Sequence, residues 1–364
     1  MVKRCEENTD LLKIEHVNAQ SLQGHIDEIE LLVIERNLDI LCISETWLSP
    51  NIHDRHISIP NFNVFRCDQG RGGGVCIYVK DSLKVSIIET NIPNNIEIED
   101  LWISIQCRKL PSIIIGAIYR HPHATNNSFD YLLDVFKNMC LQNKPIFILG
   151  DLNDNLLLQN TKLGKIIRNS KLSQIISKPT RITETTSSLL DVIITNKPEI
   201  IIQSDVLPCQ IADHELISVS IDISRPKYQP KYKTYRSLNN YDQDILCNLI
   251  LDEIPILNSI LQTDNVNTQV NTLTEVLNKC INNCAPEVTK LIRRPPAPWI
   301  DENIKLAIEE RNTIHKQLKS NRSCVILQEE YKDKKKLVKS SIHRAKTQYF
   351  QKQFQECRND TSKT

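Results

Sequence analysis

Residues 145–153 read PIFILGDLN, an apolar run that ends abruptly at a glycine and an aspartate. The four consecutive apolar residues 146–149 are typical of a strand covered on both faces, because a strand with one solvated face alternates polar and apolar positions. The side chains of Asp151 and Asn153 therefore follow a buried strand at the point where it ends. The same pattern recurs along the first 224 residues.

Further β-type runs rich in isoleucine and valine surround this stretch and predict strands. Apolar residues at helical spacing predict helices over 22–37 and 129–141, the second with Ser128 as its N-cap. Strands covered on both faces and alternating with helices predict an α/β fold, a four-layered sandwich of two packed mixed sheets flanked by helices. The other predicted strands are 11–17, 39–44, 74–79, 101–107, 112–119, 190–195 and 216–223.

The charge distribution divides the 364 residues, although the net charge is only +1. Residues 293–364 carry 17 Lys and Arg against 9 Asp and Glu, whereas residues 1–292 carry 28 against 35. The proline-rich and tyrosine-rich segment 225–240 predicts a linker, and helical patterns follow it. We expect an α/β domain over 1–224, a linker over 225–240 and an all-α basic extension over 241–364.

Twelve cysteines occur without C-x-x-C pairs, and the N-terminus lacks the apolar segment of a secretion signal. We therefore expect a non-secreted intracellular protein with reduced, mostly buried thiols. No apolar run reaches the roughly 18 residues of a transmembrane helix, so we expect no membrane partner. Cys280 and Cys284 are interpreted as core residues. The run 71–74 (RGGG) lacks the Lys-Ser/Thr of a phosphate loop, so we interpret it as a turn that places Arg71 near a ligand.

Polar side chains that could carry chemistry lie at the ends and edges of several predicted strands. Each of them alone is more simply a cap or a turn residue. Together they supply the carboxylates, amide, histidine and phenol that metal-assisted hydrolysis requires. They are Asn18, Glu45, Tyr119, Asp151, Asn153, Asp191, Asp213 and His214.

The order of the short motifs resembles the endonuclease/exonuclease/phosphatase superfamily over about residues 10–224. Within it, the sequence is most similar to the apurinic-type endonuclease domain of non-LTR retrotransposons, LINE elements of the jockey or CR1 type. The motifs are N-A-x-S-L (18–22), S-E-T-W (44–47), G-G-G-V-x-I-Y (72–78), Y-R (119–120), G-D-L-N (150–153), L-D-V-I-x-T (190–195) and A-D-H (212–214).

The resemblance implies a role for each candidate in Mg²⁺-dependent hydrolysis of a DNA phosphodiester, with Mn²⁺ as an alternative ion. Glu45 corresponds to the principal metal ligand, with Asn18 and Asp213 on the metal side. Asp151 corresponds to the base that activates water, and Asn153 to the amide that aligns it. His214, oriented by Asp191, corresponds to the phosphate-binding histidine, and Tyr119 to a tyrosine that contacts the scissile phosphate.

Basic residues are expected to bind nucleic acid, with DNA as the main partner and element RNA as a second candidate. The chain departs from the family by having Ala212 where serine is usual, and His121-Pro122-His123 where Pro-Pro often follows Y-R. The expected nucleic-acid-binding residues are Arg71, Arg120, Lys334, Lys335, Lys336, Arg344 and Lys346.

Three interpretations of function stay open from the sequence. The first is a retrotransposon endonuclease that works in the nucleus, with the cytoplasm as a second location. Its expected partner, a reverse transcriptase, is missing here, since no Y-x-D-D or F-x-D-D motif occurs. The second is an abasic-site nuclease or another phosphoesterase of the same fold. The third is an inactive nucleic-acid-binding remnant that works through its basic tail.

Overall fold

The computed structural model describes residues 11–93, 96–106, 112–183, 185–209, 211–224, 232–238, 241–291, 298–321 and 324–357. The chain divides into two compact units. The first comprises residues 1–228 and 296–346, and the second comprises residues 229–295 and 347–364. Among the described helices, none is long and apolar enough to cross a membrane.

Two six-stranded mixed sheets form the centre of the first unit. The first sheet has the order β13-β14-β1-β2-β4-β3, from β13 (Ile201–Leu207), β14 (Leu216–Ser224), β1 (Leu11–Asn18), β2 (Ile40–Ser44), β4 (Val75–Lys80) and β3 (Phe62–Cys67). The second has the order β5-β6-β7-β8-β12-β9, from β5 (Lys84–Ile88), β6 (Ile98–Gln106), β7 (Ile113–Arg120), β8 (Ile146–Asp151), β12 (Asp191–Thr195) and β9 (Ser173–Gln174).

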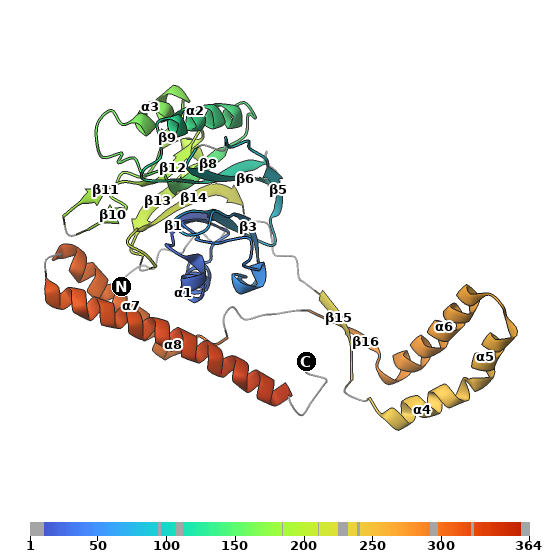
Figure 1. Ribbon diagram of the computed structural model, residues 1–364. Helices are drawn as coiled ribbons and strands as arrows, with labels where there is room; N and C mark the ends of the chain where they lie inside the picture. The colour runs from blue at the N-terminus through green and yellow to red at the C-terminus, as the bar shows by residue number, and fades with distance from the viewer. Residues whose placement is uncertain are drawn as a thin grey trace. The chain divides into compact units, whose positions relative to one another are not determined.

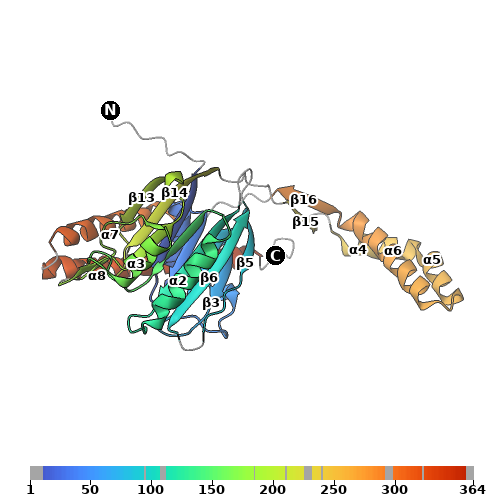
Figure 2. The same ribbon diagram turned by 90° about the horizontal axis from the view of Figure 1, so that it is seen from above.

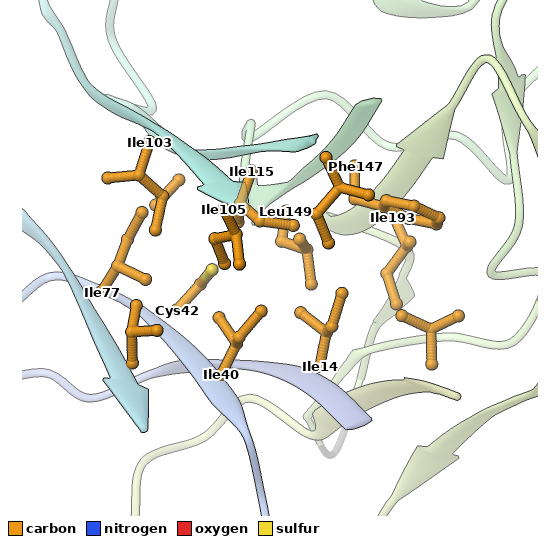
Figure 3. Close-up of a cluster of buried hydrophobic side chains, with 14 of the residues drawn as sticks. Ile14, Ile40, Cys42, Ile77, Ile103, Ile105, Ile115, Phe147, Leu149 and Ile193 are labelled. Atoms are coloured by element: carbon orange, nitrogen blue, oxygen red, sulfur yellow. The ribbon is translucent and has the colours of Figure 1, made fainter. Parts of the chain in front are cut away.

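The sheets face each other across a core of buried aliphatic side chains, which Figure 3 shows with Ile14 and Cys42 from one sheet and Phe147 and Ile193 from the other. Helix α1 (Leu22–Glu35) covers the outer face of the first sheet, and α2 (Asn127–Cys140) and α3 (Lys162–Asn169) cover the second (Figures 1 and 2). The predicted four-layered α/β sandwich is confirmed. Burial of both faces explains why most central strands are apolar throughout.

The register of the strands brings the ends that carry polar residues together. Strands β7 and β8 are parallel and pair Tyr119 with Asp151, while antiparallel β8 and β12 pair Asp151 with Asp191. Gly150 permits this close pairing, because a Cβ atom there would lie 1.8 Å from the carbonyl oxygen of Ile118. The G-D-L-N motif therefore has a structural glycine next to its functional aspartate.

Helices α7 (Glu302–Ser320) and α8 (Val325–Cys357) follow one another in the basic tail, and the part of α8 up to Lys346 belongs to the first unit with α7. Val338 and Ile342 of α8 are buried, and Lys339 Nζ donates a hydrogen bond to the carbonyl oxygen of Gly24 in α1, at 2.7 Å. Helix α8 thus packs along α1, which is visible in Figure 1.

The second unit consists mainly of α4 (Gln243–Asp252), α5 (Ile254–Ser259) and α6 (Val266–Cys284). It also contains an antiparallel pair, β15 (Tyr232–Arg236) with β16 (Glu287–Leu291), so the extension is not purely helical. Residues 225–231 and 239–240 of the predicted linker lie outside the described residues, as do 292–297 of the proline-rich break. Cys280 and Cys284 are buried as expected.

All eight predicted strands are present, although Cys107 lies outside the described residues. The N-cap prediction for α2 was wrong, because the helix starts at Asn127 and Ser128 lies inside it. The hydroxyl of Ser128 donates to the carbonyl oxygen of Thr125 and accepts from Arg120 Nε. Short elements complete the first unit: β10 (Arg181–Ile182), β11 (Ser187–Ser188) and the 3₁₀ turns Asp54–His56 and Pro198–Ile200.

Candidate active site

The ends of β8 and β12 and the loop before β14 bring Asp151, Asp191 and His214 together in a buried group. Nδ1 of His214 lies 2.8 Å from Oδ2 of Asp191 and 3.7 Å from Oδ2 of Asp151. The backbone N–H groups of Leu190 and Asp191 both donate to Thr180 Oγ1, which fixes the start of β12. The three residues form one coupled acid and base group.

Burial and mutual charge set the protonation of this group. Burial, together with the neighbouring Asp191 carboxylate, raises the pKa of Asp151 to about 7. Burial opposes charge on His214, but the adjacent carboxylates, Asp191 first, outweigh it and raise the pKa of the imidazole to about 10. Burial likewise raises the pKa of Asp191, but its pairing with His214 outweighs this and lowers it overall. At neutral pH the site therefore holds an imidazolium beside a carboxyl group that is ready to exchange a proton.

Asn18 at the end of β1 joins this group to Glu45, which follows β2. Its amide nitrogen donates to Glu45 Oε1 at 2.8 Å and to Asp151 Oδ2 at 3.0 Å. Asn18 thus turns its nitrogen toward the two carboxylates and orients them. Trp47 Nε1 donates to the other Glu45 oxygen at 3.3 Å.

Tyr119 lies on the other side of Glu45, to which its hydroxyl is hydrogen-bonded. Burial, with the nearby Glu45 and Asp151 carboxylates, raises the pKa of Tyr119, so the phenol stays protonated and can donate a hydrogen bond. Glu45 itself has a φ of 50°, a left-handed conformation that is uncommon outside glycine. This backbone conformation is held in place because Thr46 N and Trp47 N donate to the carbonyl oxygens of Gly74 and Gly73.

Asp213 lies at the rim of the site and is 39% exposed at its side chain. Its carboxylate accepts hydrogen bonds from Gln20 Nε2 at 2.6 Å and from Arg181 Nε at 2.9 Å. Its Oδ1 lies 3.9 Å from His214 Nε2. The structure therefore places Asp213 beside the histidine, where the loop before α1 and strand β10 each donate a hydrogen bond to it.

Asn153 and Arg120 are linked through the backbone. The amide nitrogen of Asn153 donates to the carbonyl oxygen of Arg120 at 2.8 Å. The guanidinium of Arg120 is buried, donates to Ser128 Oγ and the carbonyl oxygen of Ala124, and lies 4.2 Å from the centre of the Phe129 ring. Arg120, expected to bind nucleic acid, instead fixes the turn between β7 and α2, and through it the amide of Asn153.

Thr180, Gln20 and Arg181 were not predicted from the sequence, and His16 was noted only as a polar residue at the end of a predicted strand, without a role. His16 is fully buried, its Nε2 lies 3.1 Å from Ser44 Oγ, and its Nδ1 lies 3.6 Å from Asp191 Oδ1. Thr180 and Gln20 come from loops and Arg181 from the two-residue strand β10, and none of these segments has a periodic pattern. Position 16 offered a signal, because a histidine two residues before Asn18 interrupts an apolar strand.

The residues present fit a hard divalent cation. Carboxylate oxygens of Asp151 and Asp191 lie within 4.8 Å of each other beside the protonated His214, and Glu45 is joined to Asp151 through Asn18. Carboxylate oxygens at this density suit Mg²⁺, which prefers oxygen ligands. The pKa of Asp151 is raised by burial first and by the Asp191 carboxylate second, and a bound cation would oppose both effects.

The basic residues of the tail lie in varied surroundings. Lys334 pairs with Glu310, Lys335 donates to the carbonyl oxygen of Ile211, and Lys346 pairs with Asp27 and Glu30 of α1. These three stabilise the packing of the helices. Lys336 and Arg344 are exposed on α8, and Arg71 is exposed in the turn before β4.

Comparison with known proteins gives one family match. The model described as "Endonuclease/Exonuclease/phosphatase family" matches residues 14–218. No curated protein matches the chain significantly.

Similar solved structures include the endonuclease domain of TRAS1, a telomere-specific non-LTR retrotransposon, at 18% identity and a TM-score of 0.47, covering 58% of this chain and 99% of that one. AP endonuclease LMAP from Leishmania major has 11% identity and a TM-score of 0.48, with 58% and 88% covered. The 3′-5′ exonuclease NExo from Neisseria meningitidis has 13% identity and a TM-score of 0.48, with 58% and 100% covered.

Proposed function

Because the chain belongs to the Endonuclease/Exonuclease/phosphatase family, we propose that it is a Mg²⁺-dependent DNA endonuclease that hydrolyses one phosphodiester and nicks one strand. The observation that carries this proposal is the buried group of Asp151, His214 and Asp191, which combines a proton acceptor and an imidazolium within 3.7 Å. General acid and base catalysis needs both functions in reach of one reacting phosphate.

In this proposal Asp151 accepts the proton of the attacking water, for which a pKa of about 7 is suited. The imidazolium of His214 donates a hydrogen bond to a phosphate oxygen and stabilises the negative charge that grows there. The water oxygen bonds to phosphorus as the bond between phosphorus and the 3′ oxygen breaks. The departing 3′ oxygen takes a proton from solvent, which leaves a 3′-hydroxyl and a 5′-phosphate. Asn153 and Tyr119 hold the water and the phosphate in line.

Glu45 is the residue that would hold the metal ion, with Asn18 orienting its carboxylate and Asp213 at the rim. Mg²⁺, with Mn²⁺ as an alternative, would supply charge stabilisation for the phosphate when bound. Asn18 is assigned the orienting role because its amide nitrogen already bonds to Glu45 and Asp151.

The biological setting we propose is a LINE-type retrotransposon of the jockey or CR1 kind, in which the nick primes reverse transcription at the target. The motif S-E-T-W and the basic helices after the nuclease domain support this setting. A nuclear site of action, element RNA and a reverse transcriptase as further partners belong to the same proposal. So does the functional division into a nuclease domain over 1–224, a linker over 225–240 and an extension over 241–364.

A plasmid relaxation assay tests the proposed function. The purified chain should convert supercoiled plasmid to the nicked circle with Mg²⁺ and should not do so with EDTA. An abasic-site duplex and a soluble phosphomonoester serve as competing substrates in parallel reactions. Cleavage of the abasic duplex far above that of intact DNA, or hydrolysis of the phosphomonoester alone, would replace the endonuclease by another phosphoesterase.

A further inference from the structure

A groove of about 380 Å³ lies between the first turns of α1 and the middle of α8. One wall consists of Gln23 and Gly24 of α1, and the other consists of Lys336, Lys339 and His343 of α8. The α8 wall is a stripe, because positions three and four apart share one face of a helix. The groove thus lies between two segments of the first unit, α1 and α8, that are about 300 residues apart in the sequence.

The basic residues of this stripe are not paired with acidic residues. Among the residues that the structure describes, none forms an ion pair with Lys336, Lys339, His343 or the adjacent Arg344. Lys339 donates one hydrogen bond to the carbonyl oxygen of Gly24, which leaves its charge unneutralised. These residues differ in this respect from Lys334 and Lys346 on the same helix.

The acidic residues at the groove face basic residues outside the stripe. Asp27 is paired with Lys346 at 2.6 Å, and Glu28 interacts electrostatically with Lys335 and Arg311. The unpaired Lys336 and Lys339 on the α8 wall therefore favour an anionic ligand in the groove.

The groove starts next to the candidate active site. Helix α1 begins at Leu22, and Gln20 just before it donates to Oδ1 of Asp213 at 2.6 Å. On the other side, Lys335 of α8 reaches the carbonyl oxygen of Ile211, two residues before Asp213. Since one helical turn covers about 5 Å, a strand that enters the groove reaches the catalytic loop within one or two nucleotides.

We propose that this groove binds the phosphate backbone of duplex DNA beside the scissile phosphate. The inference rests on the proposed function and identifies a surface of the appended helix as part of the substrate site. From position 336 to 343 the helix rises about 10 Å, close to three nucleotides at about 3.4 Å each. Lysine and histidine contacts to phosphate oxygens give affinity without reading the sequence.

The test is the salt dependence of DNA binding by the full chain, measured in EDTA so that no cleavage occurs. The variant is Lys336→Gln with Lys339→Gln, because glutamine keeps a donor for the carbonyl of Gly24. The control is Lys137→Gln with Lys165→Gln, two exposed lysines on α2 and α3 in the opposite layer. We expect the groove variant to bind a 20-base-pair duplex roughly 10- to 100-fold more weakly at 0.1 M salt.

The slope of log Kd against log salt should fall by about 2 in the groove variant and stay unchanged in the control. Equal slopes for parent and groove variant would overturn the proposal, even if the parent nicks DNA normally. A slope change that appears with single-stranded RNA and not with duplex DNA would also overturn it. A parent that fails to nick but shows the predicted slope change would refute only the proposed function.

Discussion

Nδ1 of His214 lies 2.8 Å from Oδ2 of Asp191, and both side chains are buried. This pair holds the imidazole in one orientation and keeps it protonated, because burial of the ring is outweighed by the adjacent carboxylates. The remaining nitrogen, Nε2, is left to donate to a substrate. The charge state of the site therefore depends on a residue that itself need not contact the phosphate.

Substitution of Asp191 by asparagine should shift the pH profile of nicking toward lower pH. In the parent, kcat/KM should rise as Asp151 ionises near pH 7 and fall as His214 loses its proton near pH 10. Removing the negative charge of Asp191 lowers the pKa of both Asp151 and His214. The pKa of His214 falls more, because its ring is hydrogen-bonded to Asp191 directly. A control at the surface, Asp205→Asn, removes a half-buried carboxylate away from the site and should leave the profile unchanged. Identical profiles for D191N and the parent would disprove this role.

His16 should act through Asp191. Burial lowers the pKa of His16 to about 4, so its ring is neutral, and its Nδ1 faces Asp191 Oδ1 at 3.6 Å. Neither of these two atoms has a hydrogen-bond partner in the described structure, so His16→Ala removes a neutral ring that packs beside the Asp191 carboxylate. We expect about a tenfold loss of kcat with KM unchanged, because Asp191 and the His214 that it orients can then move from the productive geometry. Ser44→Ala, which removes the contact of Ser44 Oγ with Nε2 of His16, should lower kcat less. Equal losses of kcat in the two variants would indicate a general packing defect.

Gly150→Ala should prevent the site from forming. The added Cβ would lie 1.8 Å from the carbonyl oxygen of Ile118, so β7 and β8 would have to separate. We expect a loss of more than about 4 kcal/mol in the free energy of unfolding, measured with urea. Gly24→Ala is the matched control, because its Cβ meets nothing closer than 3.5 Å and helix propensity favours alanine by about 0.5–1 kcal/mol. A stable, active G150A protein would contradict the register described for these strands.

Lys346→Ala should loosen α8 from α1. Its ammonium pairs with Asp27 and with the nearly buried Glu30, and truncation leaves that carboxylate without its partner. We expect a cost of about 1–3 kcal/mol in urea unfolding. Lys305→Ala removes an exposed pair with Glu302 and should cost less than about 0.5 kcal/mol. Equal effects of the two substitutions would show that α8 is not held at this point.

The sequence predicted the central strands and most of the site because both depend on local patterns. Apolar runs such as 145–150 have few alternatives to a buried strand, and the catalytic candidates lie in or next to the ends of such runs. The edge strands β3, β5 and β13 were missed, since their half-exposed residues carry no continuous apolar signal. Thr180 was missed for a similar reason: its hydroxyl matters only because the fold brings it to the backbone of Asp191.

The basic tail shows what composition alone cannot supply. A charge of +8 over 293–364 predicted nucleic-acid contact, but it could not show which lysines are free to make that contact. Lys346 pairs with acidic residues about 315 residues away in the sequence, whereas Lys336 lines a groove. Arg120 gives the same lesson, because its partners Ser128 and Phe129 lie on the following helix. Long-range partners decide which charges stay available to a ligand.

The most direct test of the account compares the parent chain with Asp151→Asn in Mg²⁺-dependent nicking of supercoiled plasmid, with urea unfolding measured on both. Asparagine keeps the shape of Asp151 but cannot accept a proton from water, so we expect a loss of roughly 10²- to 10⁴-fold in rate. Burial raises the pKa of the Asp151 carboxyl, so the neutral amide avoids the cost of a buried charge, but it can accept only one of the two hydrogen bonds that Asn18 Nδ2 and Asn153 N donate to Asp151. We therefore expect only a small change in the free energy of unfolding. A D151N protein that nicks as fast as the parent would contradict the assignment of this site.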